Sequence, residues 1–98
     1  MTFNKNFSLE IKTPETVIFE GLVNSVFAPS VIGNLGILPQ HTPLLAILKK
    51  GKIKFKHPTG TSFGRLEKEY IYYTGDGFIE ILPNKVRILV EECNKLKI

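Results

Sequence analysis

The sequence has a single cysteine and no long apolar run, and each shortage excludes a class of protein. Cys93 stands alone among 98 residues, so no intrachain disulfide can form, and a lone thiol is typical of a reducing compartment. No apolar run reaches the roughly 20 residues of a membrane-spanning helix. The first ten residues also lack the continuous apolar stretch of a signal peptide. If the chain works at a membrane, we therefore expect other proteins to hold it there.

Residues that carry metal-ion or acid–base chemistry are also scarce and scattered. The two histidines, His41 and His57, and Cys93 show no metal-ligand spacing. No Ser-His-Asp or Cys-His arrangement is evident, although residues distant in sequence can still meet in the fold. Gly75–Gly77 lies between predicted strands and opens no helix, so it indicates a turn rather than a dinucleotide site. We predict no catalytic residue, no metal site and no cofactor, and we interpret Cys93 as a passive residue near a strand end.

What the sequence does contain is enough apolar surface for one domain and an excess of lysine. Hydrophobic residues make up 43% of the chain, and the net charge is +4. A chain of this size buries about two-thirds of its unfolded surface, enough for one core. Lysines alternate with other residues from Lys52 to His57, which predicts a strand with one solvated face. We interpret this strand as a sheet edge that resists unwanted pairing.

The basic charge leaves an alternative open, a small β-barrel that binds single-stranded nucleic acid. Such proteins interleave aromatic residues with lysines. The candidate stacking residues are Phe55, Tyr70, Tyr72 and Tyr73. Against this alternative, the alternation places Phe55 opposite the lysines and toward the core.

Alternation with a period of two dominates the chain and predicts an all-β fold. We expect strands over residues 7–12, 43–48, 51–57, 67–73, 78–82 and 85–91, and two strands or one kinked strand over residues 16–27. Gly21 is expected to mark a bulge or bend, and Gly75–Gly77 a tight turn with positive φ. Short strands separated by turn residues indicate a single-domain β-sandwich or flattened barrel. We place this domain at residues 1–92, followed by a short C-terminal tail at residues 93–98.

The run from Gly33 to Leu45, GNLGILPQHTPLL, is the most distinctive segment. Its glycines permit backbone angles barred to other residues, and its prolines fix their own φ and remove two donors. Apolar residues on both sides give it surface with which to be anchored. The pattern predicts a rigid, non-repetitive loop that holds His41 in a fixed pose, and such loops carry contacts more often than catalysis.

This run resembles the signature GELGILPGHAPL of the epsilon subunit of rotary ATP synthases. Two further stretches support the resemblance. Pro14–Gly21, PETVIFEG, is similar to the family's PExxxFxG, and Gly77–Val86, GFIEILPNKV, is similar to its GFLEVxPNxV. The three motifs occur in the family's order and near its spacing, and the resemblance covers residues from about Phe7 to Glu92.

The resemblance implies a fold, a role and partners. It implies a β-sandwich of about ten strands that packs against the gamma subunit and the polar loops of the membrane ring of c subunits. Gamma, epsilon and the ring turn as one rotor, so the role is mechanical, coupling proton flow to ATP synthesis without catalytic groups. The implied location is the cytoplasmic face of the bacterial inner membrane, or the equivalent organelle side, with membrane association only through the complex and no nucleic-acid partner.

The resemblance also implies candidate contact residues for gamma and the c-ring. They are Asn34, Gln40, His41 and Thr42. His41 occupies the family's histidine position, Asn34 a position where many members have glutamate, and Gln40 the place of the usual glycine. We expect Asn34 to replace an ion pair with a hydrogen bond, and Gln40 to mean that positive φ is not required or that the turn differs. Two simpler interpretations remain open: Asn34 only shapes a turn, and His41 only bonds within its loop.

Typical members continue into a C-terminal helical hairpin that inhibits ATP hydrolysis in many species and binds ATP in some. This sequence ends at Ile98, and the tail from Cys93 is too short to form a stable helix unaided. Whether the chain is a naturally short subunit or a fragment stays open. We expect the chain as given to couple rotation but neither to inhibit nor to bind ATP through that hairpin.

Overall fold

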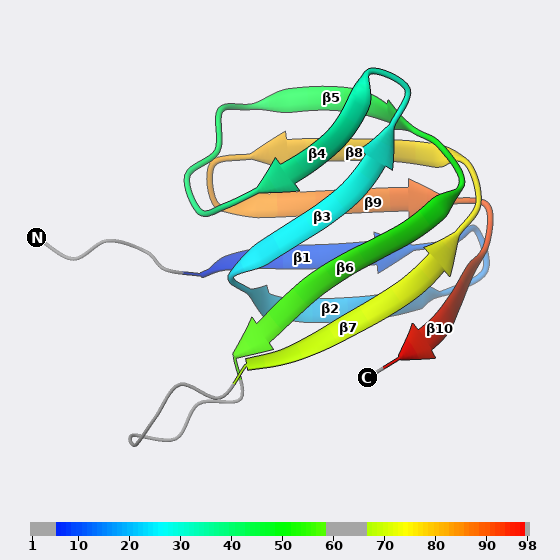
Figure 1. Cartoon of the computed structure of the whole chain (residues 1–98), viewed down its shortest axis with the longest axis horizontal. Coiled ribbons are helices and arrows are strands. Elements are labelled where there is room, and N and C mark those ends of the chain that lie inside the picture. The colour runs from blue at the N-terminus through cyan, green and yellow to red at the C-terminus, as the bar shows by residue number, and fades with distance from the viewer. Residues whose placement is uncertain (1–5, 59–66, 98) are drawn as a thin grey trace, which may run out of the picture.

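The computed structural model describes residues 6–58 and 67–97, and the regular elements of this part are all strands (Figure 1). The strands are β1 (Phe7–Lys12), β2 (Val17–Val23), β3 (Ser25–Ser30), β4 (Gly33–Ile37), β5 (Leu44–Leu48), β6 (Gly51–Pro58), β7 (Glu67–Thr74), β8 (Gly77–Leu82), β9 (Lys85–Val90) and β10 (Cys93–Lys97). The predicted all-β fold is confirmed. The segment separated off as a tail forms β10, which pairs with β7.

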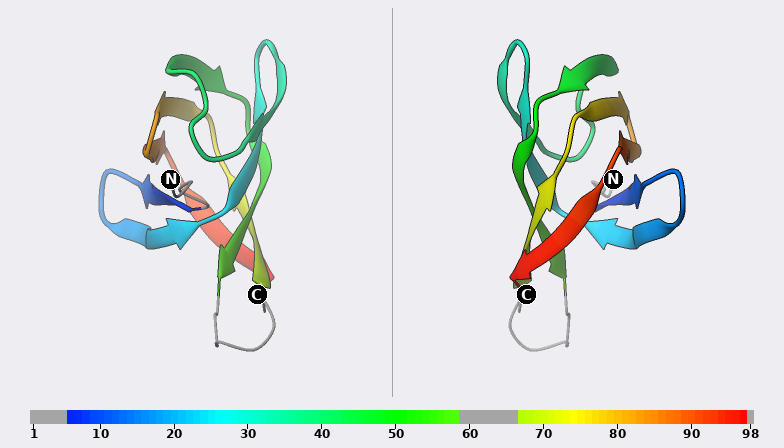
Figure 2. Two further views of the ribbon diagram at one scale, coloured as in Figure 1. Left: turned by 90° about the vertical axis from the view of Figure 1, so that its left-hand side faces the viewer. Right: turned by 90° about the vertical axis from the view of Figure 1, so that its right-hand side faces the viewer.

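The strands form one sheet that folds over on itself. The order is β10-β7-β6-β3-β5-β8-β9-β1-β2. The remaining strand, β4, pairs with the edge of β3 opposite to β6. The fold-over lies between β3 and β5, which share the single register pair Ser30 and Leu48. Two layers face each other across the core, as the side views show (Figure 2). Of the strand pairs, β1 with β9 is parallel and brings the first strand beside the ninth.

The core between the layers is built by the predicted alternation. On β9, Val86, Ile88 and Val90 face inward, and on β6 Ile53 and Phe55 do the same. The buried apolar set draws on both layers and comprises Phe7, Leu9, Ile11, Val23, Val26, Ala28, Ile37, Ala46, Leu48, Ile53, Phe55, Tyr72, Ile79, Ile81, Val86, Ile88 and Val90. The inward positions of β1 and β9 are aliphatic or Phe, and those of β8 after Gly77 are isoleucine, so these three strands fix their register by burial.

An aromatic cluster closes the seam between β2 and β6, which have no continuous hydrogen-bond ladder. The Phe19 ring of β2 lies 4.5 Å from that of Phe55 and 6.0 Å from those of His57 and Tyr70, centroid to centroid. The His57 ring donates a hydrogen bond from Nδ1 to the Leu22 carbonyl oxygen. His57 is half-buried, and its ring joins two strands.

Two local expectations are wrong. Gly21 is not a bulge, because β1 and β2 stay in register from Phe7–Val23 to Ile11–Phe19, and the irregularity falls after Ile11. A side chain at Gly21 would instead crowd the Phe19 ring, 3.2 Å from a Cβ. The lysine-bearing strand β6 is not an edge, because it pairs with β3 on one side and β7 on the other. Alternation reports which face a side chain takes, but it does not report which strands lie alongside.

Gly77 is needed for a different reason from the one expected. Positive φ occurs at Gly33 and Gly51 among the described glycines, and not in the Gly75–Gly77 turn. A Cβ at Gly77 would collide with the Leu89 carbonyl oxygen and lie 2.8 Å from Val90 Cα. The glycine therefore permits the close approach of β8 to β9 at the open end of their hairpin, away from the turn.

Candidate functional site

The distinctive run begins as a hairpin rather than as a loop. β3 and β4 pair from Val26–Ile37 to Ser30–Gly33, so Val31 and Ile32 form a two-residue turn. Gly33 has φ of +124°, and the Ser30 hydroxyl donates to the Gly33 carbonyl oxygen at 2.5 Å while accepting from the Ile32 amide at 3.2 Å. The predicted loop from Gly33 to Leu45 is thus too long. A serine three residues before a glycine is a turn signal that would have located this hairpin.

The true loop is shorter, residues 38–43, and it connects β4 to β5. Gln40 has φ of +64°, the left-handed conformation that glycine adopts without strain. Position 40 therefore does require positive φ, and the expectation that it need not is wrong. The Gln40 amide donates to the Pro83 carbonyl oxygen at 3.2 Å, which ties the loop to the β8–β9 turn. The His41 ring donates from Nδ1 to the Thr42 carbonyl oxygen at 2.6 Å, within the loop.

The structure separates the four candidate contact residues into two places. Asn34 is exposed near the start of β4, opposite Pro29. Gln40, His41 and Thr42 lie beyond the other end of β4, in the loop beside the β8–β9 turn. The two groups thus lie at opposite ends of this strand (Figure 1). A single partner would have to span the whole strand to contact both.

A surface that the sequence analysis did not single out crosses the layer opposite the lysines. Ile47 of β5, Phe78 of β8 and Leu89 of β9 are register neighbours on its outer face. Their exposed fractions are 52%, 52% and 47%. We call these three residues the apolar outer row. The sequence does indicate this surface, because β5 reads LLAIL and has leucine and isoleucine at its outward positions as well as its inward ones.

Charged side chains line one side of this row. Glu10 lies 3.7 Å from Arg87 and 3.6 Å from Lys12, and Arg87 also lies 3.7 Å from Glu80. Two carboxylates thus share one guanidinium on the outer face of β1, β8 and β9. An apolar centre with a polar margin is the usual anatomy of a protein–protein contact.

The described residues offer little for catalysis or metal binding. Burial raises the pKa of the Cys93 thiol to about 11, so the thiol is protonated and unreactive near neutral pH. The residues described hold no group of three His, Cys, Asp or Glu side chains that could bind a metal ion. In the same part of the chain, no helix long and apolar enough to span a membrane is found.

Comparison with known protein families decides which family the chain belongs to. The profile described as ATP synthase, Delta/Epsilon chain, beta-sandwich domain, matches residues 6–95. The chain belongs to this family. The ATP synthase epsilon chain of Desulfosudis oleivorans is 37% identical over 91 residues, which cover 93% of this chain and 63% of that relative. The epsilon chain of Desulfatibacillum aliphaticivorans is 40% identical over 90 residues, which cover 92% of this chain and 59% of the relative.

Solved structures show the same fold. A chain of the Euglena gracilis mitochondrial ATP synthase, in a structure of OSCP, F1 and c-ring, has a TM-score of 0.82 at 18% identity, covering 97% of this chain and 56% of that one. A chain of the Tetrahymena thermophila mitochondrial ATP synthase central stalk and c-ring has a TM-score of 0.70 at 14% identity, covering 94% of this chain and 68% of that one. The chain spans about three-fifths of the length of the two bacterial relatives.

Proposed function

We propose that the chain is a central-stalk subunit of a rotary ATP synthase, which joins the gamma subunit to the c-ring and couples proton flow to ATP synthesis. The observation that carries the proposal is the family match over residues 6–95, together with relatives named ATP synthase epsilon chain at 37% and 40% identity. In this role the chain contributes contacts and stiffness, and the catalytic groups lie in other subunits.

We propose that gamma packs on the apolar outer row. Ile47, Phe78 and Leu89 project from three neighbouring strands, so their positions are set by backbone hydrogen bonds rather than by mobile loops. A joint that carries torque needs a well-packed interface, on the order of 800 Å² per partner or more. A rigid sheet meets this requirement because it has little conformational freedom to lose when it binds a partner.

The two polar groups at the ends of β4 fit contacts with different parts of the rotor. By the family resemblance, Asn34 takes the position that faces a polar loop of the c-ring, and its amide offers hydrogen bonds where a glutamate would offer charge. His41 and Thr42, in the loop tied to the β8–β9 turn, lie beyond the opposite end of the strand. We propose that this loop contacts gamma and an adjoining part of the ring.

A pull-down with purified gamma subunit tests the proposal. The full chain should capture gamma at low and at high salt, because burial of apolar surface is insensitive to ionic strength whereas surface ion pairs are screened. Replacing Phe78 and Leu89 with serine should abolish capture. Phe27→Ser removes an equally exposed aromatic, at 49%, from the other layer and serves as the matched control.

Single-stranded oligonucleotide competes in the same experiment. Phe55 is 1% exposed and Tyr72 is 6% exposed, so two of the four predicted stacking residues lie in the core. Capture of gamma that oligonucleotide leaves unchanged supports the rotor proposal. Failure to bind gamma, with salt-sensitive capture of the oligonucleotide, would replace the proposal with the nucleic-acid alternative.

A further inference from the structure

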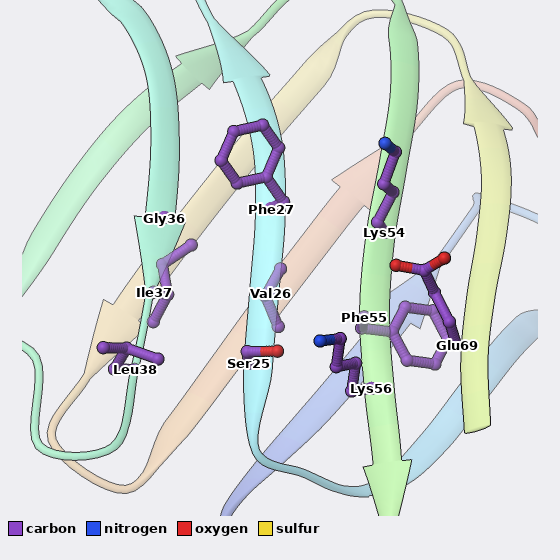
Figure 3. Close-up of a pocket in the computed structure, with 10 residues that line it drawn as sticks. All are labelled: Ser25, Val26, Phe27, Gly36, Ile37, Leu38, Lys54, Phe55, Lys56 and Glu69. Atoms are coloured by element: carbon purple, nitrogen blue, oxygen red, sulfur yellow. The ribbon is translucent and has the colours of Figure 1, made fainter. Parts of the chain in front are cut away.

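A groove crosses the outer face of the other layer, over β4, β3, β6 and β7. Its volume is about 490 Å³. The small residue Ser25 leaves it hollow between two walls, and the Phe27 ring lies on the Gly36 side (Figure 3). One wall is apolar, formed by Phe27 and Leu38, which are 49% and 63% exposed. The other wall carries charge and is formed by Lys54 and Lys56 of β6 and Glu69 of β7.

The lysines of this face form no ion pair with another described residue. Lys52, Lys54 and Lys56 all project from the outer face of β6 and are exposed. The ion pairs that join described residues involve Lys12 and Arg87, and none includes a β6 lysine. Glu69 is the register partner of Lys56 but makes no ion pair with it. The groove thus has a cationic wall with capacity for acidic groups.

We propose that this groove binds an acidic amphipathic helix of a partner polypeptide. Four neighbouring strands span about 14 Å at roughly 4.8 Å per step, which accommodates a helix about 10 Å in diameter. Side chains two residues apart on a strand are about 6.8 Å apart. Acidic side chains one helical turn apart, at i and i+4, have a similar spacing of about 6 Å. Lys54 and Lys56 therefore match successive acidic residues along one helix, whose apolar stripe contacts Phe27 and Leu38.

The shape of the groove favours a helix over a single-stranded nucleic acid. Base stacking requires flat exposed rings, and the apolar wall has one ring and one aliphatic side chain. The Phe27 ring also lies over the position of Gly36, 3.8 Å from where a Cβ would be, so one side of it is covered. A ridged surface of leucine-type side chains fills this hollow better than stacked bases do.

Fluorescence anisotropy with a labelled designed peptide tests the inference. The probe is an 18-residue helix with leucines at i, i+3, i+4 and i+7 and glutamates along the flanking stripe, and a peptide with lysines in place of the glutamates is the comparison. The glutamate peptide should bind the full chain and the lysine peptide should not. The double change Lys54→Gln and Lys56→Gln should weaken binding about fivefold to tenfold, as expected for two exposed ion pairs.

Matched variants separate a site from general charge attraction. Lys49→Gln with Lys50→Gln removes the same charge from exposed residues outside the groove and should change binding less than about twofold. Leu38→Ser should weaken binding, whereas Leu45→Ser, at a leucine that is 70% exposed on the other layer, should not. Equal losses of peptide affinity in the Lys54/Lys56 variant and in the Lys49/Lys50 variant would overturn the proposal. Displacement of the peptide by oligothymidylate, with the same groove variants losing oligonucleotide affinity, would also overturn it.

Discussion

Gly77 is, among the described glycines, the one whose replacement by alanine should cost the fold most. A methyl group there would collide with the Leu89 carbonyl and Val90 Cα, both backbone atoms that cannot turn aside. We expect Gly77→Ala to lower the free energy of unfolding by about 2–4 kcal/mol, because β8 and β9 must separate. Gly36→Ala, whose Cβ would meet only the Phe27 ring at 3.8 Å, should stay within about 1 kcal/mol of the parent. Urea unfolding measures both, and equal effects would contradict this explanation.

Gln40 should be a source of local strain. Its φ of +64° costs a residue with a Cβ on the order of 1 kcal/mol relative to glycine. The gain from Gln40→Gly is partly offset by greater freedom of the unfolded chain, so this variant should be neutral to slightly stabilising. Gln40→Val should destabilise by about 1–2 kcal/mol, because β-branched residues tolerate this region least. Thermal unfolding of the two variants tests both predictions. A valine variant as stable as the parent would show that the loop relaxes to another conformation.

Cys93 provides a pH-dependent observable. Its folded-state pKa of about 11 lies above the ordinary value of a cysteine, so folding favours the neutral thiol. The sign follows: Cys93 adds no pH dependence to stability below about pH 8.5, and it lowers stability as pH rises from there toward 11. At pH 8 its thiolate fraction is small, and a disulfide reagent should react about tenfold to a hundredfold more slowly than with free cysteine. Reaction at the free-cysteine rate would show that the thiol is accessible and ionised.

At the scale of elements, the seam between β2 and β6 depends on His57. Its ring donates to the Leu22 carbonyl and packs near Phe19 and Tyr70, with centroids 6.0 and 6.2 Å away. We expect His57→Ala to destabilise by about 1–3 kcal/mol through loss of this bond and of ring packing. Lys54→Ala on the same strand, with an exposed side chain, should stay within about 0.5 kcal/mol. Urea unfolding measures both variants. Equal shifts of the unfolding midpoint in His57→Ala and Lys54→Ala would exclude a special role for the histidine.

The sequence predicted strands and faces well but pairing poorly. Inward positions such as Val86 and Ile88 follow from alternation alone, because a strand with one buried face repeats every two residues. The central position of β6 and the register of Gly21 depend on contacts between distant segments, which no local pattern records. Among the candidate contacts, Gln40 shows the limit most clearly. Glutamine does not indicate positive φ, and only the resemblance to a glycine-bearing motif pointed to a turn there.

The groove and the apolar outer row were both missed for a related reason. Each is assembled from a few residues of three or more strands, so it becomes a surface only once the register is known. Phe27 and Lys54 are 27 positions apart in sequence yet are register partners. Ile47 and Phe78 are likewise register partners on the other layer. Sequence periodicity gave the outward direction of these side chains, but the sheet order gave their neighbours.

At the scale of the whole molecule, the two layers turn chemically different faces outward. The apolar outer row lies on the β5-β8-β9 layer, and the cationic groove lies on the layer of β4, β3, β6 and β7. Figure 2 shows the two layers from the side. The core separates them, and no side chain belongs to both surfaces. Two partners that use these faces would not compete for the same atoms.

We therefore expect gamma and the acidic peptide to bind at the same time. Size-exclusion chromatography of the chain with both should give one peak that contains all three, and saturating gamma should change the peptide dissociation constant less than about twofold, as for distant independent sites. Phe78→Ser with Leu89→Ser should remove gamma alone, and the Lys54 and Lys56 glutamine pair should weaken the peptide alone. If gamma fails to bind while the peptide still binds, the rotor role falls and the groove stands. If gamma displaces the peptide, the two faces are not separate interfaces and the groove belongs to the gamma contact.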